Sequence, residues 1–252
     1  MLKKRIIPIL LYQQGRLVKS KKFTDFRDVG NPVTTAKIYC DQDADELVIL
    51  NIDSADVCSN NFLDCIRSIS KTCNVPLTVG GGINTFKYAE NLFSEGADKV
   101  LMGTSLINFS SVGMEITEKY GSQALVACAD FIKNKNNTYL IRSGISKRDL
   151  ISLEEFLSIT TKVGAGELVL QSVYNDGTCE GLDLDFFETV KNKVSLPIIL
   201  TGGCGDMQDF RLGFEKGATA IGCGSFFCFG DNNPLRVKSQ LANYGLPLKR
   251  IK

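Results

Sequence analysis

Short runs of valine, isoleucine and leucine alternate along the chain with longer segments in which apolar positions recur at helical spacing. The runs are continuously apolar, which is typical of parallel strands covered on both faces. They predict eight strands, which begin near residues 5, 46, 76, 98, 124, 167, 197 and 219. The segments between them predict helices over residues 34–42, 62–71, 85–94, 153–161, 184–193 and 207–216.

The sequence also repeats itself with an offset of 121 residues. ADELVIL at residues 44–50 recurs as AGELVLQ, and PLTVGGG at residues 76–82 recurs as PIILTGG, so the chain consists of two similar halves. Eight strands, each followed by a helix, in two equal halves predict a (β/α)8 TIM barrel built from two half-barrels, in one domain over residues 1–252. A doubly wound open sheet is the competing architecture.

Composition narrows the classes of partner. Hydrophobic residues make up 44% of the chain and its net charge is +1, so a globular core is available and neither nucleic acid nor an acidic membrane is expected as a partner. The basic and apolar start over residues 1–12 runs into Gln13 without a cleavage site, and no apolar run approaches the ~18 residues of a membrane span. We therefore expect a cytoplasmic protein whose first apolar run is a buried strand.

The reactive residue types exclude several kinds of site. The chain has no histidine, which removes Ser–His and Cys–His nucleophile pairs and the commonest zinc ligand. Its nine cysteines form no C-x-x-C pair, so we expect reduced and mostly buried thiols, with no metal site and no cofactor. The cysteines are residues 40, 58, 65, 73, 128, 179, 204, 223 and 228.

Glycine-rich turns follow four of the predicted strands, again in pairs related by the repeat. Their backbone N–H groups, hydroxyl side chains and adjacent helix N-termini together attract phosphate. Tight strand-to-helix turns are the alternative explanation of the glycines. The two halves place these sites on opposite sides of the barrel mouth, where a ligand with a phosphate at each end would fit. The turns are Gly80-Gly81-Gly82 with Gly103-Thr104-Ser105, and Gly202-Gly203 with Gly224-Ser225.

Carboxylates stand at the expected C-terminal ends of three strands, the face on which barrel enzymes carry their active sites. Asp130 closes the fifth apolar run, Asp176 begins an Asp-Gly-Thr segment, and Asp53 follows Asn51 after the second. A carboxylate that faces the mouth can act as a general acid or base once burial tunes its pKa. A loop cap at Asp130 and a turn at Asp176 are the structural alternatives.

Four charged residues stand at or near the expected starts of strands, on the opposite face of the barrel. Two are positive and two are negative, so they can neutralise one another in a ring, where an uncompensated member would be costly. Such a ring can act as a structural plug, or as a gate that passes a small neutral molecule such as ammonia into the barrel axis. The four residues are Arg5, Glu46, Lys99 and Glu167.

Nine short segments spread along the chain carry a resemblance to a known family. They are KRII at 4–7, GRLVK at 15–19, DELV at 45–48, TVGGGI at 78–83, GADKV at 96–100, GSQA at 121–124, GAGE at 164–167, DGT at 176–178 and LPII at 196–199. From end to end the chain resembles the cyclase subunit of imidazole glycerol phosphate synthase, an enzyme of histidine biosynthesis.

The resemblance implies a cytoplasmic barrel that pairs with a separate glutaminase subunit. In that family the partner hydrolyses glutamine, and ammonia enters through the charged ring and meets a bisphosphorylated, ribonucleotide-like substrate. The resemblance also implies that Asp130 is catalytic and that Lys19 lies in a mobile loop that closes over the site. It places the phosphate contacts at Gly82, Gly103, Thr104, Asp176, Gly177, Gly203, Gly224 and Ser225.

One position departs from the family pattern. The family's cyclase uses two aspartates, at the ends of strands 1 and 5; the second is present as Asp130, but the first falls on Leu11. Leucine neither donates nor accepts a proton, so half of the acid–base pair is missing. Asn51 also stands where an acidic residue is usual, and Gln14 where aspartate is common. The substrate face has changed, whereas the face with the charged ring has not.

This asymmetry leads to three hypotheses. The first is a divergent paralogue that docks a glutaminase and carries ammonia to another acceptor, such as a surface-polysaccharide sugar held by a sugar amidotransferase. The second is an active cyclase of histidine biosynthesis that forms imidazole glycerol phosphate, with Asp53 as the nearest carboxylate that could replace the lost aspartate. The third is a non-catalytic scaffold that binds a phosphorylated small molecule.

Overall fold

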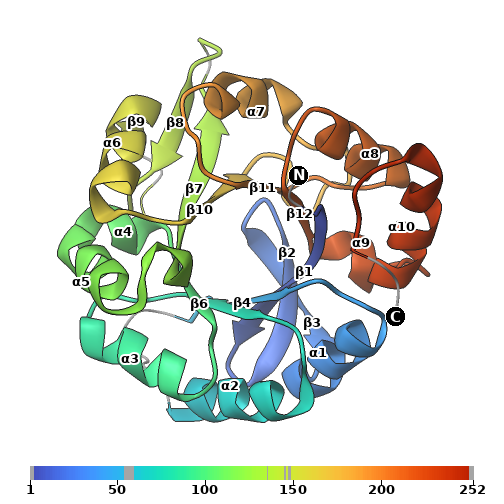
Figure 1. Cartoon of the computed structure of the whole chain (residues 1–252), viewed down its shortest axis with the longest axis horizontal. Helices are drawn as coiled ribbons and strands as arrows, with labels where there is room; N and C mark the ends of the chain where they lie inside the picture. Colours follow the sequence, from blue (N-terminus) through green and yellow to red (C-terminus); the bar gives the residue numbers. More distant parts are fainter. Residues whose placement is uncertain (1–2, 54–59, 135, 145, 147–148, 250–252) are drawn as a thin grey trace.

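The computed structural model describes residues 3–53, 60–134, 136–144, 146 and 149–249. Eight parallel strands form a barrel surrounded by helices (Figure 1). The barrel is closed because β10 pairs with β7 on one side and with β11 on the other, so the (β/α)8 prediction is confirmed and the open sheet is wrong. The barrel strands are β1 (Arg5–Gln13), β4 (Leu47–Asn51), β5 (Leu77–Gly80), β6 (Lys99–Met102), β7 (Leu125–Lys133), β10 (Glu167–Ser172), β11 (Ile198–Thr201) and β12 (Ala220–Cys223).

The repeat seen in the sequence is also a repeat of structure. Strands β5 and β6 begin 121 residues before β11 and β12, at Leu77 and Lys99 against Ile198 and Ala220. The helices that follow them keep the same offset. These pairs are α3 (Phe86–Ser94) with α8 (Met207–Glu215), and α4 (Thr104–Asn108) with α9 (Ser225–Cys228).

All six expected helices are present, and local sequence explains their ends. Thr85 accepts a hydrogen bond from the backbone of Tyr88 at the start of α3, and Asp206 forms a capping box at the start of α8. Helices α5 (Ser110–Tyr120) and α10 (Pro234–Leu241) agree with the prediction of a helix after each strand, although their ranges were not predicted. Besides α3 and α8, the helices of eight or more residues are α1 (Pro32–Asp41), α2 (Asn60–Thr72), α5 (Ser110–Tyr120), α6 (Leu153–Val163), α7 (Leu184–Lys191) and α10 (Pro234–Leu241).

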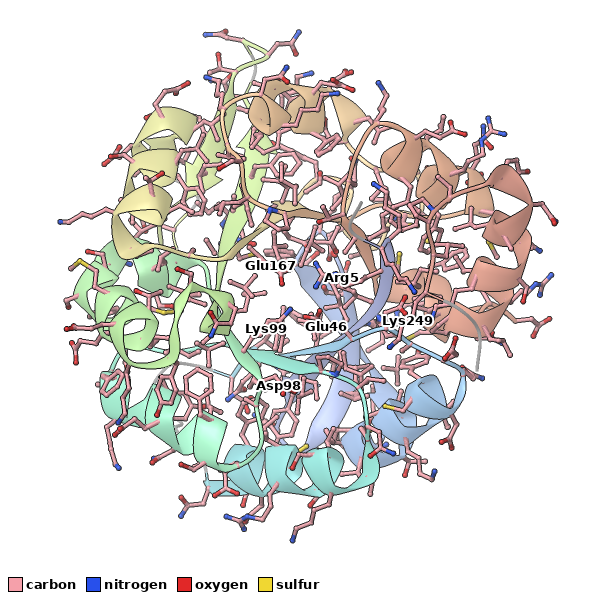
Figure 2. All side chains as sticks on the ribbon, in the orientation of Figure 1. Arg5, Glu46, Asp98, Lys99, Glu167 and Lys249 are labelled. Atoms are coloured by element: carbon pink, nitrogen blue, oxygen red, sulfur yellow. The ribbon has the colours of Figure 1, made fainter. Side chains whose placement is uncertain are left out.

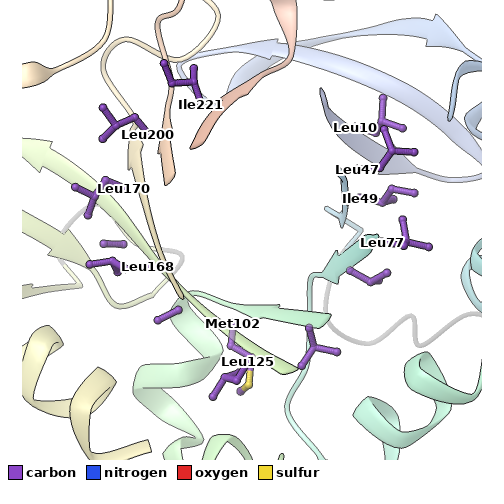
Figure 3. Close-up of a cluster of buried hydrophobic side chains, with 14 of the residues drawn as sticks. Leu10, Leu47, Ile49, Leu77, Met102, Leu125, Leu168, Leu170, Leu200 and Ile221 are labelled. Atoms are coloured by element: carbon purple, nitrogen blue, oxygen red, sulfur yellow. The ribbon is translucent and has the colours of Figure 1, made fainter. Parts of the chain in front are cut away.

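Two apolar layers lie on the two faces of the barrel wall. The larger one fills the space between strands and helices, and Figure 3 shows its members, such as Leu47, Leu125 and Leu200, arranged around the outside of the barrel. The smaller one lines the barrel axis and includes Ile7, Val48, Leu101, Val126, Cys128, Val169, Ile199 and Ala220. Burial on both faces explains why these strands lack alternation in the sequence.

Two antiparallel excursions, in which extra strands pair with an extended barrel strand, interrupt the alternation of strands and helices. The segment expected as a loop after the first strand is a hairpin of β2 (Arg16–Lys21) and β3 (Thr24–Gly30), which pairs with β1. Strand β7 does not end at Asp130 as expected but continues to Lys133, because its last residues pair with β8 (Tyr139–Arg142), which pairs in turn with β9 (Leu150–Ser152).

Buried ion pairs connect helix α10 to the segment that precedes strand β4, at the N-terminal end of the barrel. The Lys238 ammonium is 2.7 Å from Asp45 and 3.0 Å from Asp43, and the other Asp45 oxygen accepts a hydrogen bond from the backbone of Ile6. We expect Lys238→Ala to lower the free energy of unfolding by about 3–5 kcal/mol, because it leaves a buried carboxylate without its cation. Urea denaturation measures this loss. A loss no larger than that of Lys37→Ala, which breaks an exposed pair with Asp41, would contradict it.

Candidate active site

The four charged residues do converge at the N-terminal end of the barrel, where Figure 2 shows their side chains together. Arg5 is 2.7 Å from Glu46 and 2.6 Å from Glu167, and Lys99 is 3.0 Å and 2.7 Å from the same two carboxylates. Cations and anions thus alternate around the ring. The Thr78 hydroxyl donates to Glu46 at 2.6 Å, to an oxygen that Lys99 also contacts.

Mutual attraction keeps the ring charged despite its partial burial. Burial alone would lower the pKa of Arg5, but hydrogen bonds and charge attraction from Glu167 and Glu46 raise it. Burial alone would raise the pKa of Glu167, whereas Arg5 and Lys99 hold it below its ordinary value. Each carboxylate contacts both cations, so the four side chains form one continuous network at the end of the barrel axis.

Every second residue beyond the ring continues along the inside of the barrel. Arg5 is followed on the same face by Ile7, Ile9 and Leu11, because successive strand residues point to opposite faces. Glu46 is followed in the same way by Val48 and Leu50. The side chains at these positions between the ring and the mouth are therefore apolar, and they form the layer of buried residues on the barrel axis.

A cavity of about 400 Å³ opens at the C-terminal end of the barrel, next to this apolar layer. Its apolar floor consists of inward-facing strand residues, and its polar groups come from strand ends and from the β2–β3 hairpin. Of the residues expected to bind substrate, those that line it are Lys19, Gly103, Asp130, Asp176, Gly177, Gly203, Gly224 and Ser225. Gly82 and Thr104 are outside the lining and adjoin Gly81 and Gly103, which belong to it.

Asp130 faces this cavity from β7. Its register partner on the neighbouring strand β10 is Gln171. On the other side is β8, where Ile141 pairs with Phe131 and Arg142 is the next residue. The Cys128 thiol donates to the Asp130 carboxylate at 3.6 Å. Burial raises the pKa of Asp130 to about 6, against the opposing charge of Arg142 and the Cys128 hydrogen bond. A carboxyl that titrates there is suited to general acid–base chemistry near neutral pH.

Leu11 faces the same cavity from β1, beside its register partner Leu50. The other acidic candidate near this end, Asp53, is not in the cavity lining: its carboxylate accepts hydrogen bonds from the backbone of Gln14 at 3.1 and 3.2 Å. Asn51 lines the cavity and is used as a local cap, with its side chain accepting from the backbone of Asp53. Among the residues that the structure describes, Asp130 and Asp176 are the carboxylates of the lining.

The hairpin covers the mouth and is docked on Asp176. The Ser20 hydroxyl is 3.1 Å from the Asp176 carboxylate, and the backbone of Lys22 donates to the Asp176 carbonyl at 2.9 Å. Lys19, expected in a loop, lies on strand β2; its ammonium donates to the Ile9 carbonyl beside Gly224. Burial lowers the pKa of Lys19 and raises that of Asp176.

The glycine turns have a structural requirement of their own. Gly81 and Gly203 both have φ of +105°, and a Cβ on either would lie about 2 Å from a backbone oxygen, 2.0 Å from that of Asn51 and 2.1 Å from that of Gly181. Glycine is needed there whether or not an anion binds. Gly103 and Gly224 cap the short helices α4 and α9. The paired turns therefore stay a candidate phosphate site.

Sequence reasoning missed several lining residues. Arg142 comes from the β7–β9 excursion, and its guanidinium lies 5.5 Å from the ring centre of Phe23 on the hairpin. Gln171 donates to Asp176 at 3.2 Å. Neither belongs to a recognisable motif, although Gln171 could have been found by counting alternate residues from Glu167. Within the described residues, no three Cys, Asp or Glu side chains group as metal ligands, and no helix has the length and apolar character of a membrane crossing.

Comparison with known proteins decides the family. Residues 5–233 match the model of the histidine biosynthesis protein family. A putative imidazole glycerol phosphate synthase subunit hisF2 of Prochlorococcus marinus is 37% identical over 99% of both chains. The chain belongs to the HisF family. Imidazole glycerol phosphate synthase subunits HisF of Streptomyces griseus (37% identity, 97% of this chain and 98% of the relative) and Chlorobium limicola (36%, 99% and 100%) are also similar to it.

The buried carboxyl of this HisF-family cavity predicts a pH-dependent contribution to stability. The pKa of Asp130 is about 6 in the folded protein against an ordinary value of 3.8, so its stabilising contribution is complete below pH ~4 and is lost as the pH rises through 6. Relative to Asp130→Asn, the free energy of unfolding of the unaltered chain should fall by up to about 3 kcal/mol between pH 4 and pH 7. Urea titrations at both pH values measure it. A pH-independent difference between the two proteins would show that the pKa is not raised.

Proposed function

We propose that this chain is the ammonia-conducting subunit of a glutamine amidotransferase and that it serves an acceptor other than the intermediate of histidine biosynthesis. The observation that carries the proposal is Leu11, which lines the cavity at the position where the family's cyclase has its first aspartate. The ring, the apolar axis and the cavity lie in series, which is what passage of ammonia requires.

The acid–base equipment of the cavity supports a change of chemistry. Asp130 retains a carboxyl suited to proton transfer, but the side chain from β1 that should work with it is apolar. We assign Asp176 to holding the hairpin and not to replacing the lost group, because Ser20 and Gln171 each donate to one of its oxygens. Loss of a positioned proton-transfer group typically costs ~10²–10⁴ in rate, so the family's cyclase reaction would be strongly impaired here.

A glutaminase subunit is the partner that fits the N-terminal face. The charged ring lies at the centre of that face. If ammonia enters there, it must come from a protein docked on the same face, so that it does not escape into water. Opening requires one cation to leave a carboxylate, and the other cation would still neutralise it, since each glutamate has two partners. Contacts from a docked protein with the ring could offset the free energy that is lost when this one ion pair breaks.

A second protein partner fits the other end. Large aromatic side chains are exposed on four segments that follow barrel strands: Phe26 on the hairpin (45% exposed), Phe109 after α4 (44%), Tyr174 after β10 (51%) and Phe229 after α9 (64%). Exposed aromatic residues are common in interfaces. A sugar amidotransferase that presents its activated substrate at this mouth would receive ammonia there, and a phosphorylated ligand of the glycine turns would complete the site.

The histidine-pathway alternative is tested directly with the cyclase substrate and ammonium salt. We expect no imidazole glycerol phosphate from the unaltered chain, and gain of ring closure in Leu11→Asp, because the restored carboxylate would stand in the same cavity as Asp130. Product formation measured by chromatography decides the matter. Leu11→Asn is the matched control, which is polar but does not transfer protons in this way. Turnover by the unaltered chain that is abolished by Asp130→Asn would replace the proposal with the active cyclase.

Docking of the glutaminase distinguishes the conducting subunit from a phosphate-binding scaffold. We expect the purified chain to bind a HisH-type glutaminase and to raise its glutamine hydrolysis at least tenfold. We expect Arg5→Ala to reduce that stimulation severalfold, since it leaves two glutamates in the ring with one cation. Calorimetry and a glutamate-release assay give the two readouts. Absence of binding by the unaltered chain would leave only the scaffold.

A further inference from the structure

The walls of the cavity at the barrel mouth differ in chemistry from one side to the other. In the strand order of the closed barrel, β1 lies opposite β7, and β4 lies opposite β10. Leu11 on β1 and its register partner Leu50 on β4 line the cavity from one side. Asp130 on β7 and its register partner Gln171 on β10 line it from the other. The cavity therefore has an apolar wall and, across from it, a polar wall.

The apolar wall continues beyond the two leucines. Ile52, which follows β4, lines the cavity, as do Phe23 and Phe26 of the β2–β3 hairpin, which pairs with β1. Asn51 lines it as well, but its side-chain oxygen accepts a hydrogen bond from the backbone of Asp53. Contact with this wall removes apolar surface of a ligand from water, so it favours a ligand with an apolar part.

Arg142 supplies a positive charge to the polar wall. It follows Ile141 on β8, which belongs to the core between strands and helices, so strand alternation turns Arg142 towards the cavity that it lines. The Arg142 charge opposes the rise that burial causes in the pKa of Asp130, which places the two side chains near each other. A guanidinium has five N–H donors, so Arg142 can bind an oxyanion while its plane stays 5.5 Å from the ring centre of Phe23.

The two cations of the lining lie at different places. Within the described part of the chain these are Lys19 and Arg142. The Lys19 ammonium is beside Gly224, at the end of β12, and donates to the carbonyl of Ile9. Strand β12 is separated from β7 by β11 and β10, whereas β8 pairs directly with β7. Arg142 is therefore the cation on the side of Asp130, apart from the glycine turn that Lys19 adjoins.

We propose that Arg142 binds an oxyanion, a carboxylate or a phosphate, of a ligand whose apolar part contacts Leu11 and Leu50. The inference rests on the proposed function in one respect, that this ligand is the acceptor of ammonia. A planar guanidinium binds a carboxylate or a phosphate through two parallel hydrogen bonds, which fix its orientation as well as its position. Arg142 and the leucines would thus determine which part of the acceptor faces Asp130.

Titrations of the full chain with small probes, followed by ¹H NMR, test the site. Phenylacetate joins a carboxylate to an apolar ring, and phenyl phosphate joins a phosphate to the same ring. We expect the tighter of the two to bind at least about tenfold more tightly than phenylacetamide, which has the shape of phenylacetate without its charge. We also expect it to bind more tightly than acetate or inorganic phosphate, which lack the ring. The tighter probe identifies the oxyanion that the site prefers.

Variants of the two walls assign the binding to particular side chains. Arg142→Met keeps the length of the side chain without its charge, and we expect it to weaken the tighter probe at least about tenfold. Arg142→Lys should recover part of this loss, because the charge returns without the planar fork. Leu11→Ala should weaken the same probe severalfold. Lys133→Met is the matched control: Lys133 lies 5.1 Å from the ring centre of Tyr139 at the same excursion but outside the cavity lining, so binding should not change.

The outcomes separate this site from the proposed function, because the titrations use neither glutaminase nor glutamine. Oxyanion binding through Arg142 without stimulation of a glutaminase would keep the site and remove the proposed function. Stimulation of a glutaminase by a chain that binds neither charged probe would do the reverse. The proposal is overturned if neither charged probe binds the unaltered chain more tightly than phenylacetamide, a comparison that needs no variant. It is also overturned if Arg142→Met weakens binding no more than Lys133→Met.

Discussion

The alternating square of two cations and two carboxylates at the N-terminal end of the barrel is the constraint on which the rest depends. Its members come from β1, β6 and β10 and from the residue before β4, so only a closed barrel brings them together. Each carboxylate is held by both cations, so removing one cation would leave two partly buried carboxylates to share the other. The register of the strands is thereby fixed at this end.

That register determines what lies further along the axis. Because strand residues alternate between faces, the choice of Arg5 as an inward residue also makes Ile7, Ile9 and Leu11 inward residues. The same counting from Glu167 leads through Val169 to Gln171, at the cavity. A charged ring, an apolar layer and a cavity that Asp130 lines are thus consecutive layers of one barrel. The layer that departs from the family pattern is the last one, at Leu11 and Asn51, and this is the physical basis for proposing a different acceptor.

Much of this arrangement could be predicted from the sequence, because it depends on periodic features. Continuous apolar runs gave the eight strands, the repeat gave the two half-barrels, and charged residues at strand starts gave the ring. The β2–β3 hairpin was missed because residues 15–30 are mostly polar and exposed, with no apolar run of their own. For that reason the contacts of Lys19 and Phe23 with the cavity required the structure. The same is true of Arg142 and of the true end of β7 beyond Asp130, because β8 and β9 are strands of only four and three residues.

The central claim is that the ammonia passage is intact while the proton-transfer pair beyond it is not. Isotope tracing through the Leu11→Asp variant tests this claim most directly. The Leu11→Asp chain is paired with a glutaminase and supplied with amide-¹⁵N glutamine, the cyclase substrate and excess unlabelled ammonium at low pH. The account predicts that the imidazole product carries ¹⁵N, because the nitrogen travels inside the barrel. Product labelled only in proportion to the mixed pool in solution, or equal turnover by the unaltered chain, would contradict it.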